Sequence, residues 1–156
     1  CALPILKNPF CTACSTPCSK VCYQGTAFET LIDQAAAADG IIFGSPVYFG
    51  SMSAQLKAFF DKSRAQRGEK AFLGKPACAV TVGASKYGGQ ETATRAIHDC
   101  AMVQGMRIIN DGFSEFDSGH FGVSAQKPAE SDEYANKRLI ATAKRMVEEV
   151  ILTKNI

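Results

Sequence analysis

The chain has 156 residues, 17 Lys and Arg against 15 Asp and Glu, and 46% hydrophobic residues, which is typical of one globular domain. Its formal net charge of +2 gives no footprint for nucleic acid, and no apolar run reaches the ~18 to 20 residues that a membrane span needs. The composition therefore argues against nucleic-acid binding, a membrane protein and a disordered chain. We expect a single domain over residues 1–156.

The cysteines indicate a reducing compartment. The chain has 7 Cys, an odd number, and four of them lie in one short segment, which argues against a secreted disulfide framework. Residues 1–6 lack the basic region and the long apolar region of a signal peptide. We therefore expect a cytoplasmic protein.

The first elements are a strand stub and a helix. Pro4 interrupts the apolar residues 2–6, so this segment can form at most the end of a strand. Residues 26–38 repeat apolar side chains at the helical period. Thr26 is the expected N-cap, and Glu29 three positions later completes the pattern of a capping box.

The middle of the chain alternates strands and helices. Residues 41–44 form a continuous apolar run, as in a parallel strand covered on both faces, and residues 51–62 return to the helical period. Residues 64–75 are polar and are expected to form a loop. Residues 77–82 predict a second buried strand.

The last third follows the same alternation. Gly88 and Gly89 open a helix that runs to about Gln104, and residues 107–109 predict a short strand. Residues 112–131 are rich in Gly, Ser and Phe and longer than most loops, so they are a candidate lid or binding loop. A final amphipathic helix is indicated by Leu139, Ile140, Ala143, Met146, Val147 and Val150.

This succession predicts a doubly wound α/β fold, with an open parallel sheet and helices on both of its faces. In such sheets, ligands bind beyond the carboxyl ends of the strands. The residues that follow each predicted strand are therefore the first candidates for a binding site.

The loop after the first buried strand, residues 45–50, combines a rigid turn with aromatic residues. Pro46 restricts the turn, and Tyr48 and Phe49 offer flat apolar faces before a helix begins. The alternative is an ordinary strand-to-helix connection with two core aromatics. The loop after the next strand, residues 83–92, has paired glycines that permit close approach of a ligand, but a flexible loop explains it equally well.

Longer segments resemble a known family. Residues 39–61 (DGIIFGSPVYFGSMSAQLKAFFD) resemble the FMN-contact segment of the flavodoxin-like NADPH-dependent FMN reductase superfamily. Residues 88–92 and 104–109 are similar to the corresponding region of its NAD(P)H:quinone oxidoreductase branch. The resemblance covers about residues 11–149 and implies a flavodoxin-like fold.

The resemblance also implies which residues hold FMN. One edge and face of the isoalloxazine ring would be contacted by Ser45, Pro46, Val47, Tyr48, Phe49 and Gly50. The other side of the ring would be held by Gly83, Ala84, Tyr87, Gly88 and Gly89. His120 lies where the branch has a loop near the flavin, and it is either a proton donor or an exposed histidine without a role.

One feature of the family has no counterpart before Cys11. Flavodoxin-like domains begin with a strand, a phosphate-binding loop and a helix, and their strand order is 2-1-3-4-5. The resemblance therefore implies that the chain enters at the second strand of the fold. We expect that a segment of about 40 residues, carrying the central strand and the phosphate loop, precedes it.

Four cysteines form the second candidate site. Cys11, Cys14, Cys18 and Cys22 are separated by two, three and three residues, close to the spacing of bacterial ferredoxins. Thiolates packed this closely suit an iron-sulfur cluster or zinc, and the spacing is also compatible with disulfides or free redox thiols. Iron-sulfur flavoproteins of the same superfamily carry a compact four-cysteine motif here, which favours [4Fe-4S]. Cys78 and Cys100 are expected to be buried small residues.

The function that the sequence predicts is an FMN-dependent oxidoreductase passing electrons between flavin and the cluster, with no catalytic side chain required. The alternative enzyme is an NAD(P)H-dependent quinone or FMN reductase with structural or zinc-binding cysteines. A third interpretation is a metal-binding or redox-sensing protein without flavin. The expected partners are a small redox donor or acceptor (ferredoxin, NAD(P)H or quinone) and further copies in a dimer or tetramer.

Overall fold

A computed structural model describes residues 10–115 and 117–154. The helices and strands, in chain order, are α1 (Ala27–Ala37), β1 (Ile41–Pro46), α2 (Ala54–Lys62), α3 (Arg64–Gly68), β2 (Pro76–Gly83), α4 (Gln90–Val103), β3 (Arg107–Ile108), β4 (Val123–Gln126), η1 (Ala129–Ser131) and α5 (Glu133–Lys154). The expected strand stub at residues 2–6 lies outside the described residues. None of the described helices is long and apolar enough to span a membrane.

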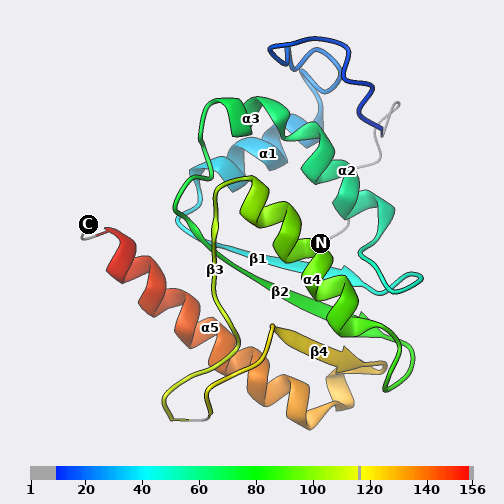
Figure 1. Cartoon of the computed structure of the whole chain (residues 1–156), viewed down its shortest axis with the longest axis vertical. Helices are drawn as coiled ribbons and strands as arrows, with labels where there is room; N and C mark the ends of the chain where they lie inside the picture. The colour runs from blue at the N-terminus through cyan, green and yellow to red at the C-terminus, as the bar shows by residue number, and fades with distance from the viewer. Residues whose placement is uncertain (1–9, 116, 155–156) are drawn as a thin grey trace.

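Strand β2 is the centre of a parallel sheet (Figure 1). On one side it pairs with β1, from Ile41 opposite Ala77 to Pro46 opposite Val82. On the other side it pairs first with β3 and then, nearer its carboxyl end, with β4. Within the described residues β1 pairs with β2 alone, so its outer edge carries no other strand. The predicted parallel sheet is confirmed.

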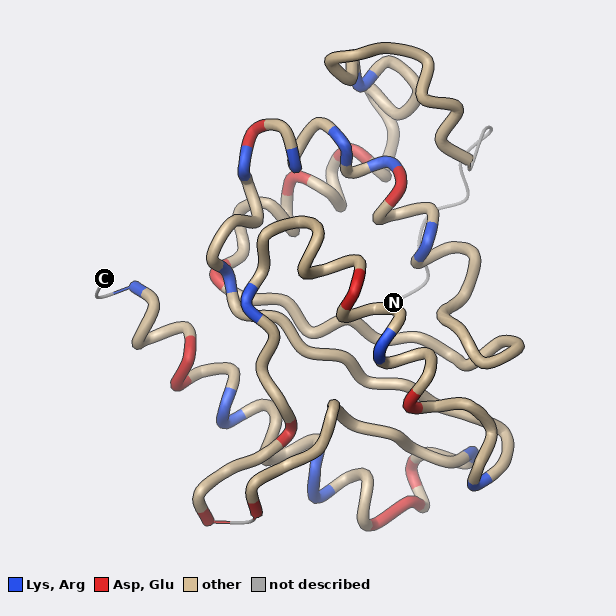
Figure 2. The backbone as a smooth tube through the Cα atoms, viewed as in Figure 1, with Lys and Arg blue, Asp and Glu red and all other residues tan. Residues whose placement is uncertain are grey.

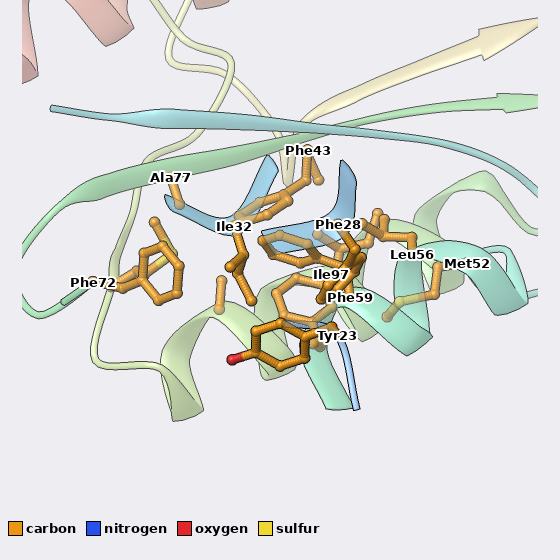
Figure 3. Packing of buried hydrophobic residues seen from close by; sticks show 14 residues of the cluster. Tyr23, Phe28, Ile32, Phe43, Met52, Leu56, Phe59, Phe72, Ala77 and Ile97 are labelled. Carbon is orange, nitrogen blue, oxygen red and sulfur yellow. The ribbon is translucent and has the colours of Figure 1, made fainter. Parts of the chain in front are cut away.

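Helices cover both faces of this sheet, as predicted. Side chains of α1, α2 and α4 pack on one face in an aromatic core around Phe28, Phe43 and Phe59 (Figure 3). The alternate residues of β2 point the other way, and there Cys78 packs with Met146 of α5. A strand that is buried on both faces needs apolar residues at every position, which explains the continuous apolar run.

Two predicted loops contain regular structure. Residues 64–68 form helix α3 rather than part of a loop, and its Ala65 and Gln66 are buried. The long segment at residues 112–131 contains strand β4, in which buried residues alternate with exposed ones. Only four residues of β4 pair, so its alternation is too short to stand out in the sequence.

The ends of the helices differ in detail from the predicted caps. Thr26 occupies the N-cap position of α1, but its hydroxyl donates to the Tyr23 carbonyl instead of capping the helix. Glu29 accepts the N–H of Gly25, 2.7 Å away, so half of the capping box forms, displaced by one residue. Helix α2 begins at Ala54 rather than residue 51, and the Ser53 hydroxyl caps it.

Helix α5 is longer than predicted and presents a different face to the core. It buries Ala135, Arg138, Ala141, Thr142 and Met146. Of the six apolar residues expected on the core side, Met146 is buried and Val150 packs partly, whereas Ile140 and Val147 are exposed. The polar Arg138 lies on the core side in place of the expected apolar stripe, because it pairs with the fully buried Asp111.

Arg138 holds the loop between β3 and β4 to α5. Its guanidinium lies 2.8 Å from the carboxylate of the fully buried Asp111 and 2.7 Å from that of Asp117, and it donates to the Tyr134 hydroxyl. Burial alone would lower the pKa of Arg138, but these hydrogen bonds raise it above its ordinary value. The Asp111 carboxylate also accepts the backbone N–H of His120.

We expect Asp111→Ala to lower the free energy of unfolding by about 3 kcal/mol, because it leaves a buried guanidinium without one of its carboxylates. Urea denaturation followed by circular dichroism measures the change. The control is Glu115→Ala, which removes the exposed partner of Lys144 and should leave stability close to that of the unmodified protein. Equal stability of the two variants would contradict the role of Asp111.

Candidate functional site

The loops that follow β1 and β2 lie against each other. The parallel register places both strand ends at one edge of the sheet, where the Val47 N–H donates to the Val82 carbonyl over 2.9 Å. Beyond this bond the loops meet at two glycines. A Cβ on Gly89 would lie 2.8 Å from the Cα of Gly50, so a side chain does not fit there. The two predicted flavin segments are thus brought together.

The loop after β1 turns tightly and presents its aromatic residues outward. Tyr48 and Ser51 exchange two backbone hydrogen bonds of 3.0 and 3.1 Å around a tip formed by Phe49 and Gly50. Both tip residues have positive φ angles, 51° and 72°. Phe49 is fully exposed and Tyr48 is more than half exposed. These faces remain available to a flat apolar ligand.

Ser45 holds this loop to the start of α2. Its buried hydroxyl accepts the Ser53 N–H over 2.9 Å and donates to the Pro46 carbonyl over 2.8 Å. Ser53 in turn caps α2 by accepting the Leu56 N–H. Because the hydroxyl of Ser45 is engaged within the protein, contact with a ligand at this position would come from the backbone.

Gln90 fixes the loop after β2, and its role was not evident from the sequence. Its side chain donates to the Ser85 carbonyl over 2.7 Å and accepts the Gly88 N–H over 2.9 Å. It also packs so closely on Gly83 that a Cβ there would lie 2.5 Å from its Nε2 atom. Ala84 and Tyr87 remain exposed on this loop. The sequence feature that could have indicated this role is a polar residue at the first position of a helix, directly after paired glycines.

A cleft of about 830 Å³ adjoins the second loop. It lies between the start of α4, β4 and the start of α5, and its lining includes Tyr87, Gln90, Lys127, Asp132 and Tyr134. No residue of the 45–50 loop lines it. His120 lies on the neighbouring β3–β4 loop, and its suggested role as a proton donor stays a prediction.

The four-cysteine segment packs on α2 and α3 at one end of the molecule (Figure 1). The Lys62 ammonium donates to the Cys22 sulfur over 3.4 Å, and Lys20 pairs with Glu69 at 2.7 Å. Tyr23, at the end of the segment, is buried edge-on against Phe28, with 5.4 Å between ring centroids. These contacts fix where the segment sits.

The thiols in this segment are free and accessible. Cys14 and Cys22 are exposed, Cys11 and Cys18 are partly exposed, and none forms a disulfide within the described part of the chain. Within the described residues, no three His, Cys, Asp or Glu side chains converge to hold a metal ion. The donor chemistry suits a soft metal or a cluster. The four-cysteine ligand set itself stays a prediction.

The other two described cysteines are removed from solvent to different degrees. Cys78 is fully buried in β2, and burial raises the pKa of its thiol to about 12. Cys100 is partly buried in α4, where burial also raises the pKa of its thiol. Cys100 and Cys11 line a second cleft of about 590 Å³ between α2, α3 and α4.

Acidic and basic residues are interspersed along the chain (Figure 2).

Comparisons with known proteins agree with this arrangement. The profile of the NADPH-dependent FMN reductase family matches residues 2–121. An iron-sulfur flavoprotein of Methanosarcina thermophila is 35% identical over 139 residues, which are 88% of this chain and 69% of the relative. An NAD(P)H dehydrogenase (quinone) of Geobacter sulfurreducens is 37% identical over 78 residues, 50% of this chain and 38% of the relative.

A solved structure shows the same fold. The flavodoxin, WrbA-like protein of Agrobacterium tumefaciens superimposes with a TM-score of 0.59 at 23% identity, covering 77% of this chain and 69% of that protein. The predicted flavodoxin-like fold is confirmed. The chain spans about two thirds of the length of the iron-sulfur flavoprotein and less than half of that of the quinone dehydrogenase.

We expect alkylation to separate the cysteines by exposure. At pH 8 the Cys78 thiol is protonated, because this pH lies far below its pKa of about 12, and it is also shielded from solvent. In metal-free native protein, iodoacetamide should modify Cys14 and Cys22 and leave Cys78 unmodified until the protein is unfolded. Peptide mass spectrometry measures this, and modification of native Cys78 at the rate of Cys14 would contradict the buried position.

Proposed function

Because the chain belongs to the NADPH-dependent FMN reductase family of flavin oxidoreductases, we propose that it passes electrons between FMN and a four-cysteine iron-sulfur cluster. The observation that carries the flavin part is the contact between Gly50 and Gly89, which joins two aromatic-bearing loops at the carboxyl edge of the sheet. The observation that carries the cluster part is a buried cation, Lys62, directed at a cysteine sulfur.

The two loops would hold the isoalloxazine ring through backbone groups and aromatic faces. Their exposed rings, Tyr48, Phe49 and Tyr87, suit a flat conjugated ligand, and the absence of side chains at Gly50 and Gly89 permits close approach. Bound FMN supplies the redox chemistry, since it accepts a hydride and can release electrons singly. Ser45 and Gln90 keep the loops in place.

Cys11, Cys14, Cys18 and Cys22 would hold a [4Fe-4S] cluster. Four free thiols in one short loop provide the ligand number and type that such clusters need. The relative from Methanosarcina thermophila is itself named an iron-sulfur flavoprotein. The protein would tune the cluster through charge and hydrogen bonds to the cysteine sulfurs.

The proposal extends to the partners. NAD(P)H, a quinone or a ferredoxin would be the small redox donor or acceptor, of which the first two occur in the names of related enzymes. The exposed apolar residues of α5, including Ile140, Val147 and Leu152, suit the proposed homo-oligomer. The cytoplasmic location stays a prediction.

A second function is supported by a separate observation. The matched relatives include NAD(P)H dehydrogenases of quinones. The alternative is therefore an NAD(P)H-dependent quinone or FMN reductase whose cysteines are structural or bind zinc. Iron distinguishes the two enzymes.

We expect protein purified without oxygen to show flavin absorption over a broad cluster shoulder, with about four iron atoms and four sulfides per chain. Cys14→Ser should lose most of the iron and keep the FMN, because the loops that hold the flavin lie elsewhere. The control is Cys100→Ala, which changes a cysteine outside the proposed cluster and should keep both cofactors. Visible spectra with iron, sulfide and zinc analysis on the same samples measure all three.

The results separate the two enzymes. Flavin without iron, or equal iron in Cys14→Ser and the unmodified protein, would overturn the cluster and favour the quinone or FMN reductase. Iron without flavin would overturn the flavin assignment.

A further inference from the structure

Lys62 is a charged residue in an unusual environment. It ends helix α2, and its side chain is only 1% exposed. Its neighbour Lys57, on the same helix, is 52% exposed and pairs with Asp61 at 2.6 Å. Lysine is rarely buried unless a negative group compensates its charge. The surroundings of Lys62 should therefore contain such a group.

Within the described residues, the partner of the Lys62 ammonium is the Cys22 sulfur, at 3.4 Å. No described carboxylate lies within ion-pair distance of it. A neutral thiol is a weak acceptor and carries no charge, so it would leave a buried ammonium poorly compensated. The carbonyl end of α2 contributes a partial negative charge, which is smaller than a full anion.

Cysteine-ligated clusters meet this requirement. The sulfurs of a bound cluster carry negative charge, and hydrogen bonds to them are one of the means by which proteins set its potential. On the basis of the proposed function, we propose that Lys62 is a positioning residue that supplies a fixed positive charge to the cluster through Cys22 and raises its reduction potential.

The direction of the effect follows from electrostatics. Reduction adds one electron, which the flavin supplies, and makes the cluster more negative. A nearby cation stabilises the reduced form more than the oxidised form, and burial strengthens this effect by lowering the local dielectric. Lys62 exchanges no electron, so its contribution is electrostatic.

The experiment compares two neutral replacements with a matched control. Lys62→Met removes the charge and the donor, and Lys62→Gln keeps a donor without the charge. Lys57→Met removes an exposed charge from the same helix. Anaerobic redox titration of the holoprotein, followed by electron paramagnetic resonance, gives the cluster potential, and circular dichroism and iron analysis verify folding and loading.

We expect Lys62→Met and Lys62→Gln to lower the ratio of reduced to oxidised cluster about tenfold at a fixed ambient potential, about 59 mV for a one-electron couple. Lys57→Met should shift it much less, because its charge is exposed and screened. Lys62→Arg keeps the charge and should retain most of the potential. Folded neutral variants that lose iron while Lys62→Arg keeps it would also support the role of the charge.

Other outcomes overturn the inference. An unchanged potential in loaded Lys62→Met, or an equal shift in Lys57→Met, would show that the charge of Lys62 has no specific effect, while the proposed function would stand. If neither neutral variant folds, Lys62→Arg decides the test. A much lower reduction potential of the cluster in Lys62→Arg would contradict an effect of the positive charge alone. Absence of iron from the unmodified protein would overturn the proposed function and this inference together.

Discussion

Strand β2 pairs in parallel with β1 on one side and with β3 and β4 on the other, and both of its faces are covered by helices. The other features of the proposed flavin site follow from this pairing. Because the two strands run in the same direction and in register, their loops leave the sheet at one edge, where Gly50 and Gly89 come into contact. Ser45 and Gln90 then fix each loop from within the protein.

Helix α2 relates the two proposed cofactor sites. Its first turn is capped by Ser53, which is hydrogen-bonded to Ser45 near the end of β1, and its last residue is Lys62, which reaches the cysteine segment. A nine-residue helix rises about 13 Å. The two proposed sites therefore lie at opposite ends of one short helix that packs on the aromatic core through Phe59 and Phe60.

The sequence predicted the elements with strong patterns and missed those that depend on distant partners. The strand at 77–82 was found because both of its faces are buried and demand apolar residues. The strand at 41–44 was also found, but the expectation that both of its faces are covered was wrong, because Ile42 is 41% exposed. Parallel pairing of the two strands then implied that their loops meet. The side of α5 that packs on the core was predicted wrongly, because Arg138 is buried there in ion pairs with Asp111 and Asp117. These two partners lie far from Arg138 in the sequence. Lys62 at the end of a helix is typical of a solvated cation, and nothing local signals its burial.

The contact between Gly50 and Gly89 is the basis of the proposed flavin site, and the affinity for FMN of Gly89→Ala tests it most directly. Gly89 has a φ of +89°, and an added Cβ would overlap Gly50, so the loops must separate. We expect at least about tenfold weaker binding by fluorescence titration, a loss of about 1.4 kcal/mol. Gly68→Ala, where nothing lies within 4 Å, should bind normally. Unchanged affinity in folded Gly89→Ala would contradict a flavin site built on this contact.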